Sequence, residues 1–403
     1  MGGAYTALAD DFSAVFYNPA GLSEALDSNL TVGGLWARPY FYYQDQGEPK
    51  SYPHLYSTGS LTLGVTSNLG HMTGYNQLAP WTLGLCLYLP VERALLADVP
   101  SENSEKRFVF YLDQAQVMAF LVSLSWKISG WLSIGAGANL LADLRAPNEA
   151  FVKVDLQTVV PYLLQLSDLS KTVRPRIMRD AEVKAAPIIG IQMQPFAWLR
   201  VGVTYRGKFY AETVGSQDVL LRFMDFSGQS DFALQTAVLA DIHYIHYWNP
   251  HQVSGGFAFF PTEALRVGLD LTWADWSAYL DPTWYSPVLG FSDTFTPRFG
   301  LEYRFATGVL LRGGYYFQPT PVPEQRQVSN YLDCDKHVFS VGLGYTFPKL
   351  PFLPIWKKPL TLEGYLQYAQ LVSRTYHKYY GYGDSLELGG YMINGGLSAT
   401  LHY

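Results

Sequence analysis

The sequence is short of charge and of long apolar runs, and both shortages narrow the class of protein. Charged residues make up 15% of the chain, against roughly 25% in typical soluble domains. No run of about 18 or more uninterrupted apolar residues occurs, which excludes transmembrane helices. If the chain spans a membrane, a closed β-barrel is the one architecture left, because lipid cannot satisfy unpaired backbone groups.

Excess positive charge, paired cysteines and clustered metal ligands are also missing. The net charge of −6 provides no basic surface, so nucleic acid is not an expected partner. Cys86 and Cys334 are far apart in the chain, and Cys86 falls inside a regular strand pattern, so we expect two free thiols. His243 and His246 fall on opposite faces of one strand and His251 is further along, so no metal site is expected.

What the sequence has in quantity is aromatic residues and glycine. Aromatic residues account for 16% of the chain, and there are 30 tyrosines and 36 glycines. In successive segments every second residue is apolar, as in strands that turn one face toward lipid. Such segments include 81–89, 118–126, 132–140, 199–205, 265–273 and 339–347.

The alternate positions of these and later segments carry glycine and charge. An arginine or lysine that faces lipid at mid-membrane costs about 2–4 kcal/mol. We therefore expect these side chains to face the interior of a barrel. The set comprises Arg200, Gly202, Thr204, Arg206, Arg266, Gly268, Asp270, Arg298, Gly300, Glu302, Arg304, Arg312, Gly314 and Glu363.

Short and long connections alternate between the segments, which is typical of a barrel with long loops at its outer end. Seven long connections are expected, at 44–54, 97–107, 146–180, 215–235, 280–294, 318–335 and 373–389. Two connections at the opposite end, 68–80 and 348–359, are longer than a hairpin needs. The pattern predicts an all-β protein, a 14-stranded antiparallel transmembrane β-barrel over residues 29–403.

Residues 1–28 precede the first expected strand and differ from it in composition. Small residues open the stretch, the acidic pair Asp10 and Asp11 follows, and the turn sequence Asn18-Pro19-Ala20 comes near its end. Small residues allow close packing, and Asn-Pro supplies turn geometry. We expect a compact hatch inside the barrel, shaped by Asn18 and Pro19. An ordered N-terminal arm is the alternative.

The acidic pair of the hatch is a candidate for ion pairs with arginines on the inner wall. Asp10 and Asp11 are expected to pair with residues such as Arg200, Arg266 or Arg298 and so to hold the hatch in place. Partly buried pairs of this kind are also where a ligand-triggered rearrangement can act. The alternative is that the two aspartates cap turns.

The longest outer loops carry apolar side chains that could bind a hydrophobic ligand. In the stretch 156–169 several of them share one face of a helical period, although Pro161 interrupts it. The expected ligand-binding residues are Phe151, Tyr162, Leu163, Leu166 and Phe223. The alternative is that these side chains only pack on neighbouring loops.

The hatch sequence GGAYTALADDFSAVFYNPAGL resembles the N-terminal hatch of the FadL-type outer-membrane transporters of long-chain fatty acids and hydrophobic compounds. Its acidic pair followed by Asn-Pro-Ala is similar to that family's most specific motif. YYFQPTPVPEQRQVSNYLDCDKHVFSVGLGY and, more weakly, HYWNPHQVSGGFAFFP with LRVGLDLTWADWS resemble later family strands and loops. The terminal GGLSATLHY resembles the signal by which bacterial outer-membrane barrels are recognised for insertion.

The resemblance implies a hatch-filled barrel of fourteen strands in the bacterial outer membrane, which is a transporter and not an enzyme. It implies a hydrophobic small molecule such as a long-chain fatty acid as substrate, outer-membrane lipid around a monomer, and no cofactor. The substrate is expected to be captured by outer loops, to enter an apolar lumenal pocket and to leave sideways through the wall. Because the chain begins without a charged segment and apolar core, we expect it to be a mature or truncated form.

A sideways exit requires a break in strand pairing, and Pro90 is the expected place. It ends the alternating run in LYLPVER, and a proline cannot donate a ladder hydrogen bond. The charges of Glu92 and Arg93 then stand where an outward apolar face should continue. The alternative is that Pro90 marks only a strand end near the outer rim.

Two other functions remain open at this point. A PorV-type barrel resembles the same family and has a similar N-terminal motif, but it acts as a partner in protein secretion, so co-purification with a secreted protein would favour it. An outer-membrane lipase or acyltransferase is the weaker rival, because the sequence has no recognisable motif with a Ser or Cys nucleophile beside a His and an acid.

Overall fold

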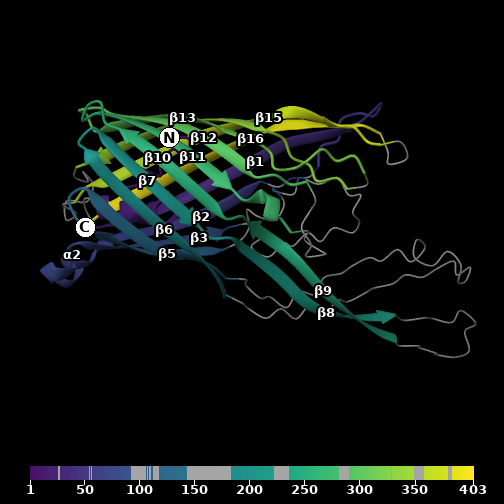
Figure 1. The fold of residues 1–403 in the computed structure, drawn as a ribbon, viewed down its shortest axis with the longest axis horizontal. Coiled ribbons are helices and arrows are strands. Elements are labelled where there is room, and N and C mark those ends of the chain that lie inside the picture. Colours follow the sequence, from purple (N-terminus) through teal and green to yellow (C-terminus); the bar gives the residue numbers. More distant parts are fainter. Residues whose placement is uncertain are drawn as a thin grey trace, which may run out of the picture.

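The chain folds into a closed antiparallel barrel of fourteen strands, as the sequence predicts (Figure 1). The structure is a computed structural model that describes residues 1–25, 28–53, 55, 57–91, 106, 108, 110–111, 118–142, 183–221, 236–280, 290–327, 329–348, 358–379 and 384–403. Around the wall the strands follow the order β1-β16-β15-β14-β13-β12-β11-β10-β7-β6-β5-β4-β3-β2, which closes because β1 pairs with both β16 and β2.

The strands of the wall are of unequal length. Those at the closure are the longest, because β1, β15 and β16 extend beyond the rest at the outer end (Figure 1). The wall strands are β1 (Asn29–Asp45), β2 (Thr58–Asn68), β3 (Trp81–Pro90), β4 (Ala119–Lys127), β5 (Leu132–Ala142), β6 (Val183–Phe196), β7 (Leu199–Arg206), β10 (Gln252–Phe259), β11 (Leu265–Ala274), β12 (Thr294–Arg304), β13 (Val309–Gln318), β14 (Lys336–Phe347), β15 (Leu360–Tyr376) and β16 (Leu386–His402).

A two-stranded ribbon continues the wall beyond its outer end. It consists of β8 (Phe209–Leu221) and β9 (Thr236–Asn249), which follow β7 and precede β10 in the chain and pair with each other. Figure 1 shows it projecting past the barrel. β8 runs into 215–235, where the sequence predicts a long connection, because outside the membrane no lipid-facing alternation marks a strand.

Short helices fill two of the connections. The segment 68–80, too long for a hairpin, contains α2 (Leu69–Thr73) and the 3₁₀ turn η2 (Asn76–Leu78). Asn68 caps α2 by accepting hydrogen bonds from the Gly70 and His71 amides, and Gly74 ends it in the left-handed conformation. A further 3₁₀ turn, η4 (Trp276–Ala278), follows β11. No helix among the described residues is long and apolar enough to cross a membrane.

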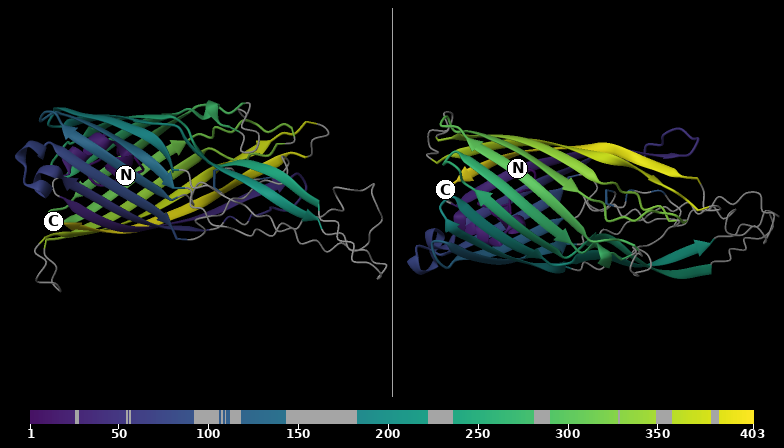
Figure 2. Two further views of the ribbon diagram at one scale, coloured as in Figure 1. Left: turned by 90° about the horizontal axis from the view of Figure 1, so that it is seen from below. Right: turned by 45° about the horizontal axis from the view of Figure 1, so that its top comes forward.

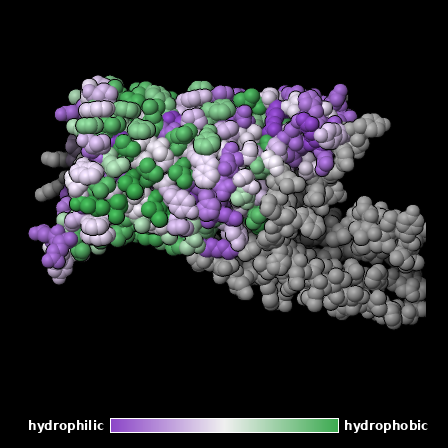
Figure 3. Space-filling view, in the orientation of Figure 1, coloured by the Kyte–Doolittle hydropathy of each residue, from purple (hydrophilic) through white to green (hydrophobic). Residues whose placement is uncertain are grey.

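The outer face of the wall is apolar and is bounded by aromatic pairs. In β14, for example, the side chains of Phe339, Val341 and Leu343 are 53–61% exposed, as expected of a face turned to lipid. Figure 3 shows apolar side chains over the barrel and polar ones over the outer ends of β15, β16 and β1. Stacked aromatic rings mark the inner end at Trp81 and Trp126, and the outer end at Tyr40 and Tyr391.

The N-terminal segment packs against strands on most sides of the wall. It contains α1 (Ala14–Tyr17) and the 3₁₀ turn η1 (Pro19–Glu24), and Figure 2 shows it in purple within the ring of strands. Inner-face glycines receive it so closely that an added Cβ would come within 3.0 Å of a hatch atom. This glycine belt comprises Gly64, Gly84, Gly135, Gly190, Gly202, Gly268, Gly300 and Gly314.

Candidate functional site

Asn18 is the buried residue that connects the two halves of the hatch. Its Nδ2 donates to the backbone oxygens of Thr6 (2.8 Å) and Ile191 (3.1 Å), while its Oδ1 accepts from the Ala20 amide (3.1 Å). The side chain is fully buried, and it fits because Gly190 leaves the space that a Cβ would fill. Pro19 then opens η1 at the position where a missing N–H costs nothing. The Asn-Pro-Ala sequence therefore joins the two halves of the hatch and ties them to β6.

The acidic pair of the hatch has two different environments. Asp10 forms an ion pair with Arg266 on β11 (2.9 Å) and accepts a hydrogen bond from the Tyr5 hydroxyl (2.8 Å). Asp11 instead accepts from the Ser13 amide (2.8 Å) and hydroxyl (2.6 Å), which is the turn-capping alternative. One aspartate thus contacts the wall, and the other orders the turn that leads into α1.

The other two arginines expected to hold the hatch make different contacts. Arg200 pairs with Glu24 at the end of η1 (3.0 Å), and Lys127 pairs with the same carboxylate (3.0 Å). Arg298 donates to the Thr272 hydroxyl on the neighbouring strand (2.6 Å) and has no ion pair with a described residue of the hatch. The partner of each arginine depends on the position of that arginine along the barrel axis. The alternating pattern shows that the side chain faces inward but does not give this position.

Asp270, one of the residues expected to face the interior, contacts the hatch. Its Oδ2 accepts hydrogen bonds from two successive backbone amides, those of Tyr5 (2.9 Å) and Thr6 (2.8 Å). The carboxylate is 6% exposed, so both bonds are shielded from water. The alternating pattern of 265–273 places this charged residue on the inward face. Its partner can be identified only when the position of the hatch in the barrel is known.

A ladder of alternating charge runs from the hatch across the wall. After the Asp10–Arg266 pair, Arg266 lies 3.5 Å from Glu302 on β12, Glu302 accepts from Arg312 on β13 (2.7 Å), and Arg312 reaches Glu363 on β15 (2.6 Å). β14 lies between the last two strands and places Gly342 and Gly344 there. Because these positions carry no side chain, Arg312 and Glu363 can meet across β14.

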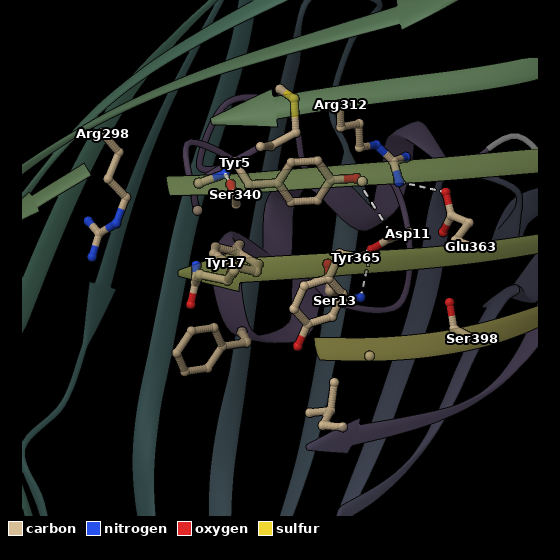
Figure 4. Close-up of a pocket in the computed structure, with 18 of the residues that line it drawn as sticks. Tyr5, Asp11, Ser13, Tyr17, Arg298, Arg312, Ser340, Glu363, Tyr365 and Ser398 are labelled. Carbon is tan, nitrogen blue, oxygen red and sulfur yellow. Dashed lines mark hydrogen bonds and ion pairs between the residues drawn. The ribbon is translucent and has the colours of Figure 1, made fainter. Parts of the chain in front are cut away.

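A cavity of about 710 Å³ lies beside the hatch within the barrel. It is lined by hatch residues, by β7 and β10–β13 on one side, and by β14–β16, β1 and β2 on the other. Figure 4 shows Tyr5 and Asp11 of the hatch near the Arg312–Glu363 pair. The lining is both aromatic and charged, and so is more polar than the expected apolar lumenal pocket.

The expected capture residues cannot be placed, whereas the expected exit residue can. Phe151, Tyr162, Leu163, Leu166 and Phe223 all lie outside the described residues.

Pro90 is the last residue of β3 and still pairs with Ser60 of β2, while pairing with β4 ends at Tyr88 and Ala119. The Val91 amide donates to Gly59 on the β2 side (2.9 Å). Since successive amides of a strand point to opposite neighbours, the donor that Pro90 lacks is one that would face β4.

The free thiols and His251 have structural surroundings. Cys86 and Cys334 are both unpaired. Cys334 precedes β14, is fully buried, and burial raises the pKa of its thiol to about 12. His251 contacts the Tyr205 hydroxyl through Nδ1 (2.9 Å), and the same nitrogen accepts from the Lys208 amide (3.0 Å).

The family and its solved structures match this architecture. The model of the family described as "Outer membrane protein transport protein (OMPP1/FadL/TodX)" matches residues 1–351. Alkane uptake protein A of Marinobacter nauticus is 23% identical over 391 residues, which cover 91% of this chain and 80% of that protein.

Solved structures share the fold at low sequence identity. A Pseudomonas aeruginosa FadL homologue aligns with a TM-score of 0.63 at 15% identity, covering 99% of this chain and 95% of that one. The Pseudomonas putida toluene transporter TodX aligns with a TM-score of 0.56 at 16% identity, covering 97% and 94%. With the family match over most of its length, the chain belongs to the OMPP1/FadL/TodX family of transport proteins and is a β-barrel of the bacterial outer membrane.

Proposed function

We propose that this barrel takes up hydrophobic small molecules, such as long-chain fatty acids, across the outer membrane. The observation that carries the proposal is a hatch that packs closely against most of the wall with a cavity beside it. A barrel interior filled in this way obstructs the diffusion of hydrophilic solutes. It favours a substrate that binds in the barrel and leaves by another route. Family membership and a relative named for alkane uptake support a hydrophobic substrate.

In the proposed route, outer loops capture the substrate, which then passes into the barrel and leaves sideways into the membrane. The capture residues are Phe151, Tyr162, Leu163, Leu166 and Phe223. The exit is at Pro90, where the β3–β4 ladder has ended and the proline offers no donor to extend it. A substrate that leaves there never has to cross the hatch.

Uptake of a fluorescent long-chain fatty acid by cells that express the protein tests this function. We expect uptake above that of cells lacking the barrel, and a loss of at least about half on deletion of 156–169, since capture precedes every later step. Pro90→Val is expected to slow uptake at equal membrane levels, because valine restores the missing donor. Undiminished uptake by the loop deletion or by Pro90→Val would reject the capture site or the exit site, respectively.

A further inference from the structure

Arg38 is the one arginine or lysine at an outward-facing position of the described wall strands. On β1 it continues the outward row of Val32, Gly34 and Trp36, which alternates with inward residues such as the buried Phe41. The other arginines and lysines of these strands are at inward positions. Because a cation that faces hydrocarbon is unfavourable, an outward arginine at this level calls for an anionic partner.

Arg38 lies just below the aromatic boundary at the outer end of the wall. Two residues further along β1, Tyr40 stacks on Tyr391 of β16, with ring centres 4.9 Å apart, and Tyr391 contacts Tyr368 of β15 at 5.7 Å. The Arg38 guanidinium is 4.9 Å from the centre of the Tyr40 ring. The side chain therefore extends from its place on the wall toward the head-group level, beside a row of three tyrosines.

The Arg38 guanidinium has no acidic partner in the part of the chain that the structure describes, where no carboxylate oxygen lies within 4.0 Å of it. The outward carboxylate of these strands, Glu387, is opposite Gln44, six residues beyond Arg38. Glu387 accepts from the Tyr42 hydroxyl (3.1 Å), and Lys50 lies over that tyrosine ring (3.8 Å). Glu387 thus has a cation of its own nearby, and the charge of Arg38 remains to be balanced.

An apolar groove of about 1040 Å³ lies on the lipid-facing side of the same strands. It extends over β1, β2 and β13–β16, and side chains that border it are strongly exposed, Leu397 at 74% and Leu343 at 61%. The outward glycines Gly34 and Gly364 flank Leu397 in the register and leave the floor of the groove bare. Gly34 is four residues from Arg38 along β1, which is about 13 Å.

A phosphorylated lipid of the outer leaflet matches the groove and the cation together. The outer leaflet of the bacterial outer membrane consists of lipopolysaccharide, whose lipid A has phosphates on a disaccharide and several acyl chains. A phosphate at the head-group level can accept charge-assisted hydrogen bonds from Arg38. A second copy of the barrel is a poorer match, because a symmetric contact between copies in one membrane brings the same surface and the same depth together, and so two Arg38 side chains.

We propose that this face of the wall is a binding site for lipid A. A phosphate binds Arg38, the sugar lies against the row of Tyr40, Tyr391 and Tyr368, and an acyl chain occupies the groove over Gly34. Tyrosine suits the middle position, because its ring is apolar and its hydroxyl can form hydrogen bonds at the membrane surface. The inference goes beyond the proposed function, since it concerns a lipid partner of the outer face of the wall, whatever the barrel transports.

The test measures lipid binding to the purified, delipidated full-length barrel in an uncharged detergent by native mass spectrometry. The probes are lipid A, the same lipid without its phosphates, and phosphatidylglycerol. Arg38→Gln removes the charge from the head-group site. Arg326→Gln, which removes an exposed outer arginine paired with Glu324, is its matched control.

A second pair of variants tests the groove. Gly34→Leu fills it without a clash at the backbone, since an added Cβ at Gly34 has no neighbour nearer than 4.0 Å. Gly255→Leu is the matched control, because Gly255 is at an outward position of β10, away from the groove, where an added Cβ meets nothing within 4 Å. Heat-shifted migration on gels checks that every variant is folded.

We expect the parent and Arg326→Gln to bind lipid A about tenfold more tightly than the phosphate-free lipid, and Arg38→Gln to lose most of that preference. Gly34→Leu should weaken the binding of both lipids by about fivefold or more, because it displaces the acyl chain, and Gly255→Leu should weaken neither.

Three results would overturn the lipid A site. The first is a parent that binds the phosphate-free lipid or phosphatidylglycerol as tightly as lipid A. The second is unchanged binding of lipid A by Arg38→Gln or by Gly34→Leu. The third is a dimer of the parent that Gly34→Leu separates, which would show that a second copy covers the groove. Because none of these measurements involves uptake, each leaves the proposed function standing.

Discussion

Asp270 shows how one side chain can fix the position of a whole segment. A single carboxylate oxygen accepts from the amides of Tyr5 and Thr6, in a place where water has little access. Hydrogen bonds to a buried charge are among the stronger non-covalent contacts in a protein. The first half of the hatch is thus attached to β11 by its backbone, whatever its own side chains are.

Replacing Asp270 with alanine is therefore expected to loosen the first half of the hatch. It removes the acceptor of both amides, which should weaken the docking of the hatch against the wall by about 2 kcal/mol or more. Hydrogen exchange at Tyr5 and Thr6 should accelerate while the wall strands keep their protection. Asp293→Ala is the control, since Asp293 also accepts a backbone amide, that of Ser277, but away from the hatch. Unchanged exchange at Tyr5 and Thr6 would show that the carboxylate is dispensable.

Cys334 is a buried free thiol that precedes β14. The thiol is fully buried, and its pKa is raised to about 12 by that burial. Because the thiolate is the reactive form, a Cys86→Ser variant of the folded protein should resist a maleimide at neutral pH and react once unfolded. Mass spectrometry before and after denaturation measures this. Rapid labelling of the folded variant would place Cys334 in contact with solvent.

The glycine belt explains how a 14-stranded wall accommodates its hatch. At Gly202 an added Cβ would lie 2.4 Å from the Thr6 carbonyl oxygen, and at Gly135 it would lie 2.3 Å from Pro19. These contacts join backbone to backbone, so no side-chain rotation can relieve them. Strand and hatch can be this close only because the inner face is bare at these points.

Gly202→Ala and Gly255→Ala form a matched test of the belt on adjacent strands. An added Cβ at Gly202 strikes the hatch, whereas at Gly255 it meets nothing within 4 Å. Overpacking of this kind costs about 1–3 kcal/mol, so Gly202→Ala should displace the hatch and make liposomes containing the barrel permeable to small sugars. Gly255→Ala should leave them as tight as the parent. Equal permeability of the two variants would contradict the role of the belt.

The strands could be predicted from the sequence because lipid imposes a simple rule on them. Every second residue faces hydrocarbon, so rows such as 265–273 and 339–347 identify wall strands by their period, and the number of long connections gives fourteen. The β8–β9 ribbon and α2 could not be predicted in this way. Outside the membrane no lipid enforces the period, and local capping by Asn68 and Gly74 decides the structure of 68–80.

The site was less predictable because it depends on register and depth. Inward arginines follow from the alternation, but their partners depend on which residues share a height in the bore. Arg266 faces Asp10, while Arg200 reaches Glu24 at the far end of the hatch. Arg298 has no ion pair with a described hatch residue, and this difference from Arg266 could be found only in three dimensions.

The route of a substrate through the barrel depends on whether the hatch must leave its place. The wall is a closed ladder of strands, and the hatch is attached to it at β5, β6 and β11, among others. Passage straight through the bore requires many of these contacts to break at once. Passage sideways at the outer end of β3 leaves these contacts intact. Fixing the hatch to the wall should therefore block the first route and not the second.

A reversible tether can fix the hatch. Ser23 Oγ of η1 lies 2.7 Å from Ser133 Oγ of β5, so cysteines at these positions are close enough for a disulfide. Cys86→Ser removes the thiol nearest to the hatch, and the buried Cys334 can remain. If the exit is lateral, cells with the oxidised tether should take up fluorescent fatty acid at a rate within about twofold of the same cells after reduction, a difference of about 0.4 kcal/mol or less. Uptake that stops on oxidation and returns with reductant would mean that the hatch moves as a body, and the route past Pro90 would then be wrong.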